Sequence, residues 1–121
     1  MYHIHFGYKD KSIDKAVEII RYADMYLGIP SVVFDPDTDR RQLYGKAGSF
    51  RLQKHGCEYR VLSSFMMSSD ELIRFCFNNA LKTLEAFERK AEKVPEDIVQ
   101  ECINNSNVKL AKELIKRYKL I

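Results

Sequence analysis

Hydrophobic and polar positions alternate with two different periods along this 121-residue chain. Residues 2–8 alternate with a period of two, which predicts a half-buried strand with His3 and His5 together on its polar face. Over residues 13–27 the apolar positions recur every three or four residues, and Ser12 precedes them as a helix N-cap. The first part of the chain therefore predicts a strand followed by a helix.

Glycine, proline and β-branched residues predict where this helix ends and where further strands lie. Gly28 and Pro30 follow the last periodic position and predict the end of the helix. Three strands are then predicted, over residues 31–34, 49–53 and 58–65. The last two are expected to form a hairpin with Gly56 at its turn.

The remainder of the chain predicts helices. Residues 68–71 read Ser-Ser-Asp-Glu, a capping box, and an apolar stripe follows as far as Ala91. Pro95 is expected at the first position of a short helix, and the asparagine-rich residues 104–107 separate it from a last helix beginning at Val108. The order β-α-β-β-β-α-α-α predicts an α+β fold, in which helices cover a small, mostly antiparallel sheet and the C-terminus is helical.

The composition is that of an ordinary globular protein, with 45% hydrophobic and 31% charged residues. We expect a single domain over residues 1–121, strand-rich with one helix over 1–67 and helical over 68–121. The net charge of +3 does not by itself indicate a nucleic-acid partner, and no apolar run approaches the ~20 residues of a membrane span. Three widely spaced cysteines indicate free thiols in a reducing compartment, so a cytoplasmic location is predicted.

His3 and His5 are candidate metal ligands. They lie two residues apart on one face of the first predicted strand, so both imidazoles reach the same region of space. Such a pair suits metal binding, because imidazole is a common protein ligand for divalent ions. An exposed polar face of an edge strand is the alternative interpretation.

Glu58 and Arg60 are predicted to share one face of a strand, with Tyr59 buried on the other. A carboxylate that holds a cation beside a guanidinium that holds an anion is the combination that a nucleotide–metal site requires. A cross-strand salt bridge is the alternative.

Cationic side chains are concentrated between residues 40 and 60, where Glu58 is the only acidic residue. They are Arg40, Arg41, Lys46, Arg51, Lys54 and Arg60. Gly45 and Gly48 flank Lys46, so this segment is a candidate phosphate-binding loop through side chains and backbone N–H groups. Arg51 and Arg60 lie on adjacent predicted strands and are expected to point into one site, although a solvated loop would also account for the charges.

Several motifs together resemble one family. They are HIHFG at residues 3–7, LGIPSVVFDPDTDRR at 27–41, LYGKAG at 43–48, FR at 50–51 and GCEYRVLS at 56–63. The sequence resembles the phage-associated amidoligases, which are ATP-dependent carboxylate–amine ligases of type 2 with the fold of glutamine synthetase and glutamate–cysteine ligase. The resemblance covers essentially the whole chain.

The resemblance implies roles for individual residues. His3 and Glu58 match the positions that hold the Mg²⁺ bridging the phosphates of ATP. Arg51 and Arg60 match arginines that contact phosphate or the substrate carboxylate. The basic residues that match the family's nucleotide-facing loop are Arg40, Arg41 and Lys46.

The resemblance also indicates what this sequence lacks. Family members are about twice as long, and their first half contributes a Gly-x-Glu-x-Glu strand that is absent here. We therefore expect the C-terminal half of a ligase fold that is not catalytically complete alone, and we expect it to bind a nucleotide or another phosphorylated ligand through a cationic pocket. One alternative is a ligase part completed by a separate N-terminal-half chain or a neighbouring copy. The other is a self-associating, homo-oligomeric interaction module that uses an open sheet edge.

Overall fold

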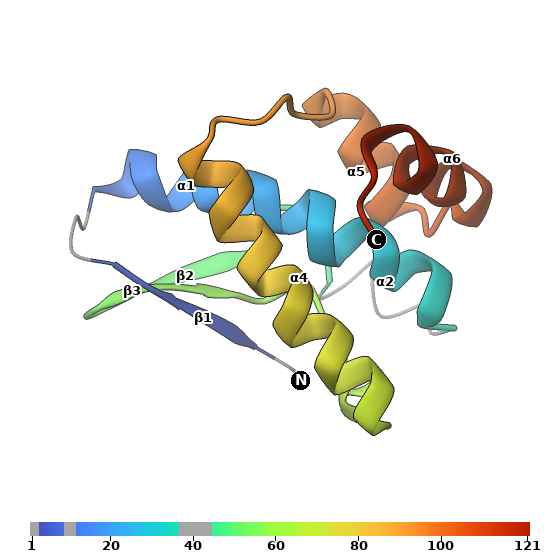
Figure 1. Ribbon diagram of the computed structural model, residues 1–121, viewed down its shortest axis with the longest axis horizontal. Helices are drawn as coiled ribbons and strands as arrows, with labels where there is room; N and C mark the ends of the chain where they lie inside the picture. The colour runs from blue at the N-terminus through green and yellow to red at the C-terminus, as the bar shows by residue number, and fades with distance from the viewer. Residues whose placement is uncertain (1–2, 9–11, 37–44) are drawn as a thin grey trace.

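A small antiparallel sheet lies against one side of a group of helices, as Figure 1 shows. The computed structural model describes residues 3–8, 12–36 and 45–121. The strands are β1 (Ile4–Gly7), β2 (Phe50–Gln53) and β3 (Gly56–Tyr59). The α-helices are α1 (Ile13–Ala23), α2 (Ile29–Phe34), α4 (Asp70–Glu88), α5 (Glu96–Asn104) and α6 (Val108–Tyr118). This arrangement confirms the predicted α+β fold.

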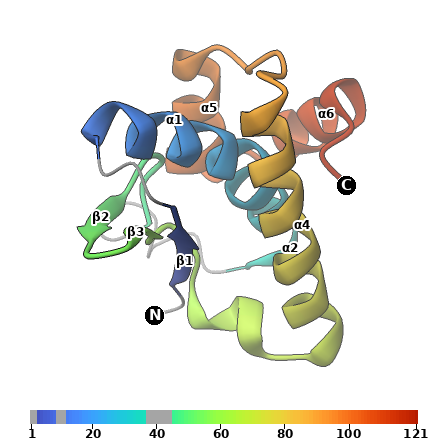
Figure 2. The same cartoon turned by 60° about the vertical axis from the view of Figure 1, so that its left-hand side comes forward.

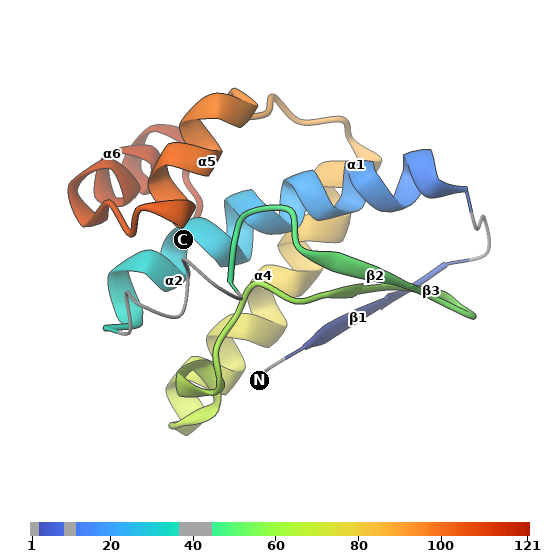
Figure 3. The same cartoon turned by 180° about the vertical axis from the view of Figure 1, so that it is seen from behind.

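The sheet has the order β1-β3-β2, and both pairs are antiparallel. Its register places His5 opposite Glu58 on one side and Arg51 opposite Glu58 on the other. Side chains alternate between the faces, so one face presents these polar residues and the other presents Phe6 and Tyr59 to the helices. α1 runs across this second face in Figures 1 and 3. We call the first face, which carries His3, His5, Arg51, Gln53 and Glu58, the polar face.

The hairpin is confirmed, but its second strand is shorter and begins earlier than predicted. β3 starts at Gly56, the turn is formed by residues 54 and 55, and the chain leaves the sheet after Tyr59. Residues 64–67 form a 3₁₀ turn and not the end of a strand. Gly56 has a φ of +154°, and a Cβ there would lie 1.7 Å from the carbonyl oxygen of Phe6. The close approach of β1 therefore explains why a glycine begins this strand.

The predicted end of the first helix is wrong, and so is the predicted strand at residues 31–34. Ser12 caps α1 through the N–H of Lys15, as expected, but the chain then continues through a π-helical segment, Asp24–Gly28, directly into α2. Pro30 lies in the first turn of α2 and has no N–H to continue the hydrogen bonds of the π-helical segment, the last of which runs from the N–H of Ile29 to the carbonyl oxygen of Asp24. The apolar run at 31–34 resembled a strand because residues 22–32 are buried and Val33 and Phe34 are half-buried, and a helix buried on most sides loses its amphipathic period.

The C-terminal helices agree with the sequence, with small shifts at their starts. Ser69, and not Ser68, caps α4 through the N–H of Leu72. Pro95 is the N-cap residue of α5 and not its first helical residue, and Asn107 caps α6. Figure 3 shows α5 and α6 side by side at the end of the molecule away from the strands, and Figure 2 shows the same helices from another side.

The core lies between the sheet, α1, the π-helical segment and α4. Buried Asn79 of α4 ties this core to the C-terminus, because its Nδ2 donates to the carbonyl oxygens of Tyr26 and Leu120 at 2.7 Å each. The three cysteines are free and buried, as expected. Among the described residues, no helix is both long enough and apolar enough to span a membrane.

Candidate functional site

Glu58 is the centre of the polar face, because β3 is the middle strand and both neighbouring strands place polar side chains beside it. Although it lies on the face opposite to the helices, its side chain is only 1% exposed. The residues that enclose it are polar. A buried carboxylate of this kind persists only where its oxygens are paired and hydrogen-bonded.

Each oxygen of Glu58 has a partner. Arg51 donates to Oε2 through Nε at 3.1 Å and through Nη2 at 2.9 Å, and Gln53 Nε2 donates to the same oxygen at 2.6 Å. On the other side, His3 Nδ1 contacts Oε1 of Glu58. The site therefore combines all three strands, with His3 just before β1, Glu58 on β3, and Arg51 and Gln53 on β2.

These contacts set the charge states of the site. Burial raises the pKa of Glu58, but Arg51, His3 and Gln53 together outweigh it, so the pKa lies below its ordinary value and the carboxylate is ionised at neutral pH. Burial lowers the pKa of His3, and Arg60 and Arg51 lower it further, against the opposing effect of Glu58. His3 is therefore neutral at pH 7. Its contact with a carboxylate oxygen requires the proton on Nδ1, so the lone pair is on Nε2.

The cations of the polar face are arranged to meet an anion. Arg51 is fixed by Glu58, yet its side chain remains 59% exposed, so the guanidinium N–H groups that Glu58 does not use face solvent. Arg60 follows β3, and its backbone N–H donates to the Ser49 carbonyl oxygen at 2.9 Å. This bond continues the pairing of β2 with β3, so alternation places Arg60 on the same face as Glu58, and its charge contributes to the lowered pKa of His3.

The predicted metal ligands are only partly brought together. His3 and Glu58 contact one another, and His5 is opposite Glu58 in register but exposed. Among the described residues, no group of three or more His, Cys, Asp or Glu side chains is placed to hold a metal ion. Metal binding by these residues stays a prediction.

The predicted basic loop is separated into parts. Arg40 and Arg41 lie outside the described residues. Lys46 is exposed, and the amides that follow it are already used within the protein: Ala47 N–H donates to Asn104 Oδ1 at 2.7 Å, and Gly48 N–H donates to Asp24 Oδ1 at 3.1 Å. These two backbone amides are therefore not available to bind phosphate. Phosphate binding by this segment would depend on its side chains alone.

Two residues of importance were not predicted from the sequence. Gln53 could have been found from strand alternation, because it lies two residues after Arg51 on the same face. Asp24 gave no such signal. It is buried in the π-helical segment, its Oδ1 accepts from Tyr59 Oη at 2.7 Å, and burial raises its pKa to about 7.

Comparison with known proteins adds one match. The protein family described as "Phage phiEco32-like COOH.NH2 ligase-type 2" matches residues 2–117. No curated protein and no solved structure matches the chain. The family match runs from before β1 to the last turn of α6, so it spans every residue of the polar face.

Proposed function

Since this chain belongs to the phage phiEco32-like COOH-NH2 ligase type 2 family, we propose that its polar face binds the phosphate groups of a nucleotide. ATP is the nucleotide that such a ligase implies, and another phosphorylated ligand would use the same groups. The observation that carries the proposal is the pairing of Arg51 with the buried Glu58, which holds an exposed guanidinium in place beside Arg60.

The chemistry of a carboxylate–amine ligase supports this assignment. A carboxylate is a poor electrophile and must be activated before an amine can attack it, and transfer of a phosphoryl group from ATP is the activation that the family implies. Phosphoryl transfer depends on fixed positive charge, because negative charge is spread over the phosphate oxygens in the transition state. Arg51 supplies such a charge with its orientation already fixed, so little side-chain entropy is lost when phosphate binds.

The residues of the polar face fit the phosphate groups of a nucleotide–metal complex better than they fit its metal ion. The exposed N–H groups of Arg51 and the charge of Arg60 suit phosphate oxygens. A divalent metal would supply further charge neutralisation, with His3, His5 and Glu58 as the candidate ligands, but Oε2 of Glu58 is already occupied by Arg51 and Gln53. A complete metal site on this face therefore needs carboxylates beyond the described residues, and we assign this chain a binding role and not complete catalysis.

Calorimetric titration with ATP, with and without Mg²⁺, tests the proposal, and inorganic triphosphate serves as a probe that lacks the nucleoside. We expect Arg60→Ala to weaken binding about 10- to 100-fold, the loss typical of one charged hydrogen-bonding partner. Because Arg60→Ala leaves the Arg51–Glu58 pair intact, we expect the variant to fold, and weaker binding can be attributed to the lost charge. Lys112→Ala, which removes an exposed charge from α6, is the matched control. Absence of binding by the unaltered protein to all three probes would overturn the proposal.

A second candidate function, self-association, is favoured by a different surface. Within the described residues β1 pairs only with β3, so its other edge is open. A groove of about 360 Å³ lies between this edge and α4, and no Lys, Arg, Asp or Glu lines it. On α4 the exposed apolar residues Ile73, Phe77 and Leu81 recur every four positions beside the edge, and Phe77 is 65% exposed.

We propose that a second copy of this chain occupies this groove, with the two β1 edges paired antiparallel. An uncharged apolar stripe beside an open edge is complementary to itself, so a two-fold contact brings no like charges together. Light scattering after gel filtration should then report a dimer that Phe77→Asp converts to a monomer. Val108→Asp, at an exposed apolar position on α6, should leave the dimer intact. A monomer at every protein concentration would be decisive against this candidate.

A further inference from the structure

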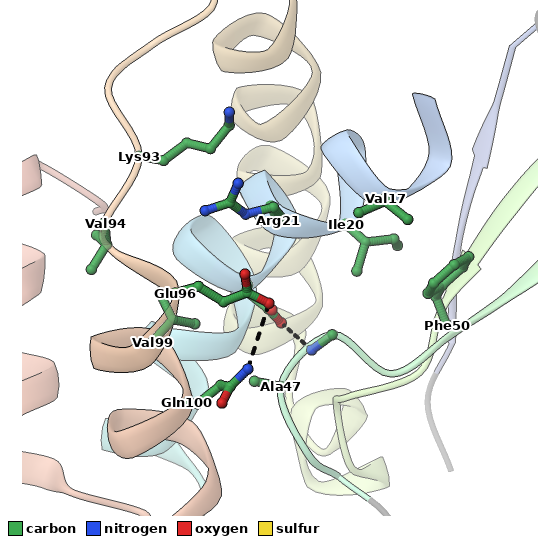
Figure 4. Close-up of a pocket in the computed structure, with 12 residues that line it drawn as sticks. Val17, Ile20, Arg21, Ala47, Phe50, Lys93, Val94, Glu96, Val99 and Gln100 are labelled. Carbon is green, nitrogen blue, oxygen red and sulfur yellow. Dashed lines mark hydrogen bonds between the residues drawn. The ribbon is translucent and has the colours of Figure 1, made fainter. Parts of the chain in front are cut away.

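A cavity lies on the helix side of the sheet, away from the polar face. It has a volume of about 120 Å³ and is enclosed by α1, the residues that precede β2, and the start of α5, as Figure 4 shows. A cavity needs only about 10–15 Å³ on this measure to hold one water molecule, so this one has room for a small organic molecule. Its apolar wall is formed by Val17, Ile20, Phe50, Val94 and Val99.

The polar part of the lining carries both signs of charge. Arg21 and Lys93 supply the cations, and Asp24 and Glu96 supply the carboxyl groups. Lys93 is already engaged, because its Nζ lies 2.6 Å from Oε1 of Glu18. Within the described part of the chain, Arg21 forms no ion pair, although it lines the cavity.

Asp24 is the most unusual member of this lining. The residue is 5% exposed, and both of its hydrogen bonds, from Tyr59 Oη and Gly48 N–H, go to Oδ1. Among the described residues no donor reaches Oδ2. The cavity lining therefore contains two polar groups that lack a partner among the described residues. One is Oδ2 of Asp24, which has no hydrogen-bond donor, and the other is the guanidinium of Arg21, which has no ion pair.

We propose that this cavity binds a small α-amino acid as its zwitterion, with the ammonium group at Asp24 and Glu96, the carboxylate at Arg21, and the side chain against the apolar wall. The ammonium supplies the partner that Oδ2 lacks, and the amino-acid carboxylate supplies the partner that Arg21 lacks. A ligand with one charge would satisfy only one of these groups. The raised pKa of Asp24 agrees with this assignment, because the effect of burial outweighs the hydrogen bonds from Tyr59 and Gly48 and the charge of Arg21, and an ammonium placed at Oδ2 would favour the ionised carboxylate.

The site is distinct from the polar face and does not depend on the proposed phosphate binding. It has one physical link to that face. Asp24 Oδ1 accepts from the side chain of Tyr59, whose backbone joins Glu58 to Arg60. An amino acid that holds Asp24 ionised would strengthen this hydrogen bond and stabilise the middle strand of the sheet.

Calorimetric titration with L-alanine, ethylamine and propionate separates the charge requirements. Ethylamine keeps the ammonium without the carboxylate, and propionate keeps the carboxylate without the ammonium. We expect L-alanine to bind at least about tenfold more tightly than either analogue. Slightly below neutral pH its binding should release protons as Asp24 ionises, which appears as a dependence of the measured heat on the ionisation enthalpy of the buffer. No binding of L-alanine, or binding of ethylamine with the same affinity, would overturn the proposal.

Matched variants assign the contacts. Arg21→Gln should weaken L-alanine binding but leave proton release in place, whereas Asp24→Asn should remove both. Arg117→Gln, which alters an exposed cation on α6, is the control. If Asp24→Asn fails to fold, Glu96→Gln on the exposed rim tests the ammonium contact instead. Arg21→Gln should bind ATP as the unaltered protein does, so a failure here is distinguishable from a failure of phosphate binding.

Discussion

Arg51 and Glu58 lie directly opposite each other on the two strands of the hairpin, and two N–H groups of the arginine meet a single oxygen of the carboxylate. The carboxylate is buried and the guanidinium is exposed. The pair therefore holds an exposed cation in place on a buried anion of the same face.

Glu58→Gln should release Arg51 from its fixed position. The change keeps the shape of the side chain but removes the charge that three neighbours recognise, and we expect a loss of about 1–3 kcal/mol in the free energy of unfolding measured in urea. Because the pKa of Glu58 is lowered, its stabilisation is present above its unfolded pKa near 4.5 and is lost as the pH falls through the lower folded value. The difference in stability between the Glu58→Gln variant and the unaltered protein should therefore shrink in acid, whereas Glu113→Gln on α6 should show neither effect.

Asp24 should give the protein an opposite pH dependence. Its folded pKa is raised to about 7 from 3.8, so between these values the folded state binds a proton that the unfolded state does not. Stability therefore falls as the pH rises from about 4 to about 7, by as much as ~4 kcal/mol. Urea titrations at several pH values should show this slope in the unaltered protein and its loss in Asp24→Asn. Asp97→Asn, exposed on α5, is the control, and an unchanged slope in Asp24→Asn would contradict the assignment.

Gly56→Ala should disrupt the pairing of β1 with β3. The added Cβ would lie 1.7 Å from the Phe6 carbonyl oxygen, and the φ of +154° disfavours any side chain. We expect a loss of about 2–4 kcal/mol in thermal or urea unfolding. Gly7→Ala is a matched control on the neighbouring strand, because its Cβ would meet nothing closer than the His55 carbonyl oxygen at 3.6 Å. Equal effects of the two substitutions would contradict the register.

Asn79→Ala should loosen the C-terminus from the core. The substitution leaves the carbonyl oxygens of Tyr26 and Leu120 without their common donor, and we expect a loss of about 1–3 kcal/mol in the free energy of unfolding, the scale of a buried unsatisfied group. Hydrogen exchange at the end of α6 should also become faster. Asn78→Ala, one residue earlier and exposed, should leave both measurements unchanged.

Much of the fold could be predicted because its signals are local. The alternation around His3 and His5 identified β1, and the stripes behind the capped helices identified α4, α5 and α6. The predicted strand at residues 31–34 failed for a tertiary reason. α2 is covered by its neighbours, and once a helix is buried on most sides its sequence no longer shows which secondary structure it adopts.

The positions of the candidate site residues in the sheet could also be predicted from local signals. Strand alternation placed Glu58 and Arg60 together, and the hairpin brought Arg51 to them. The burial of Glu58 and the role of Asp24 could not be inferred, because both depend on contacts between residues far apart in the sequence, such as Asp24 with Tyr59.

The π-helical segment Asp24–Gly28 has a consequence for how the chain tolerates change. Each residue of an α-helix turns the chain by about 100°, and a π-helical turn contains more residues than an α-helical one. The segment thus sets the angle between the side chains that α1 directs at the sheet and those that α2 directs at α6. Deletion of a single residue within it would rotate all of α2 about its axis, so the number of residues in this segment is constrained as well as the identity of Asp24 and of Gly28, where a Cβ would lie 2.6 Å from Tyr59 Oη.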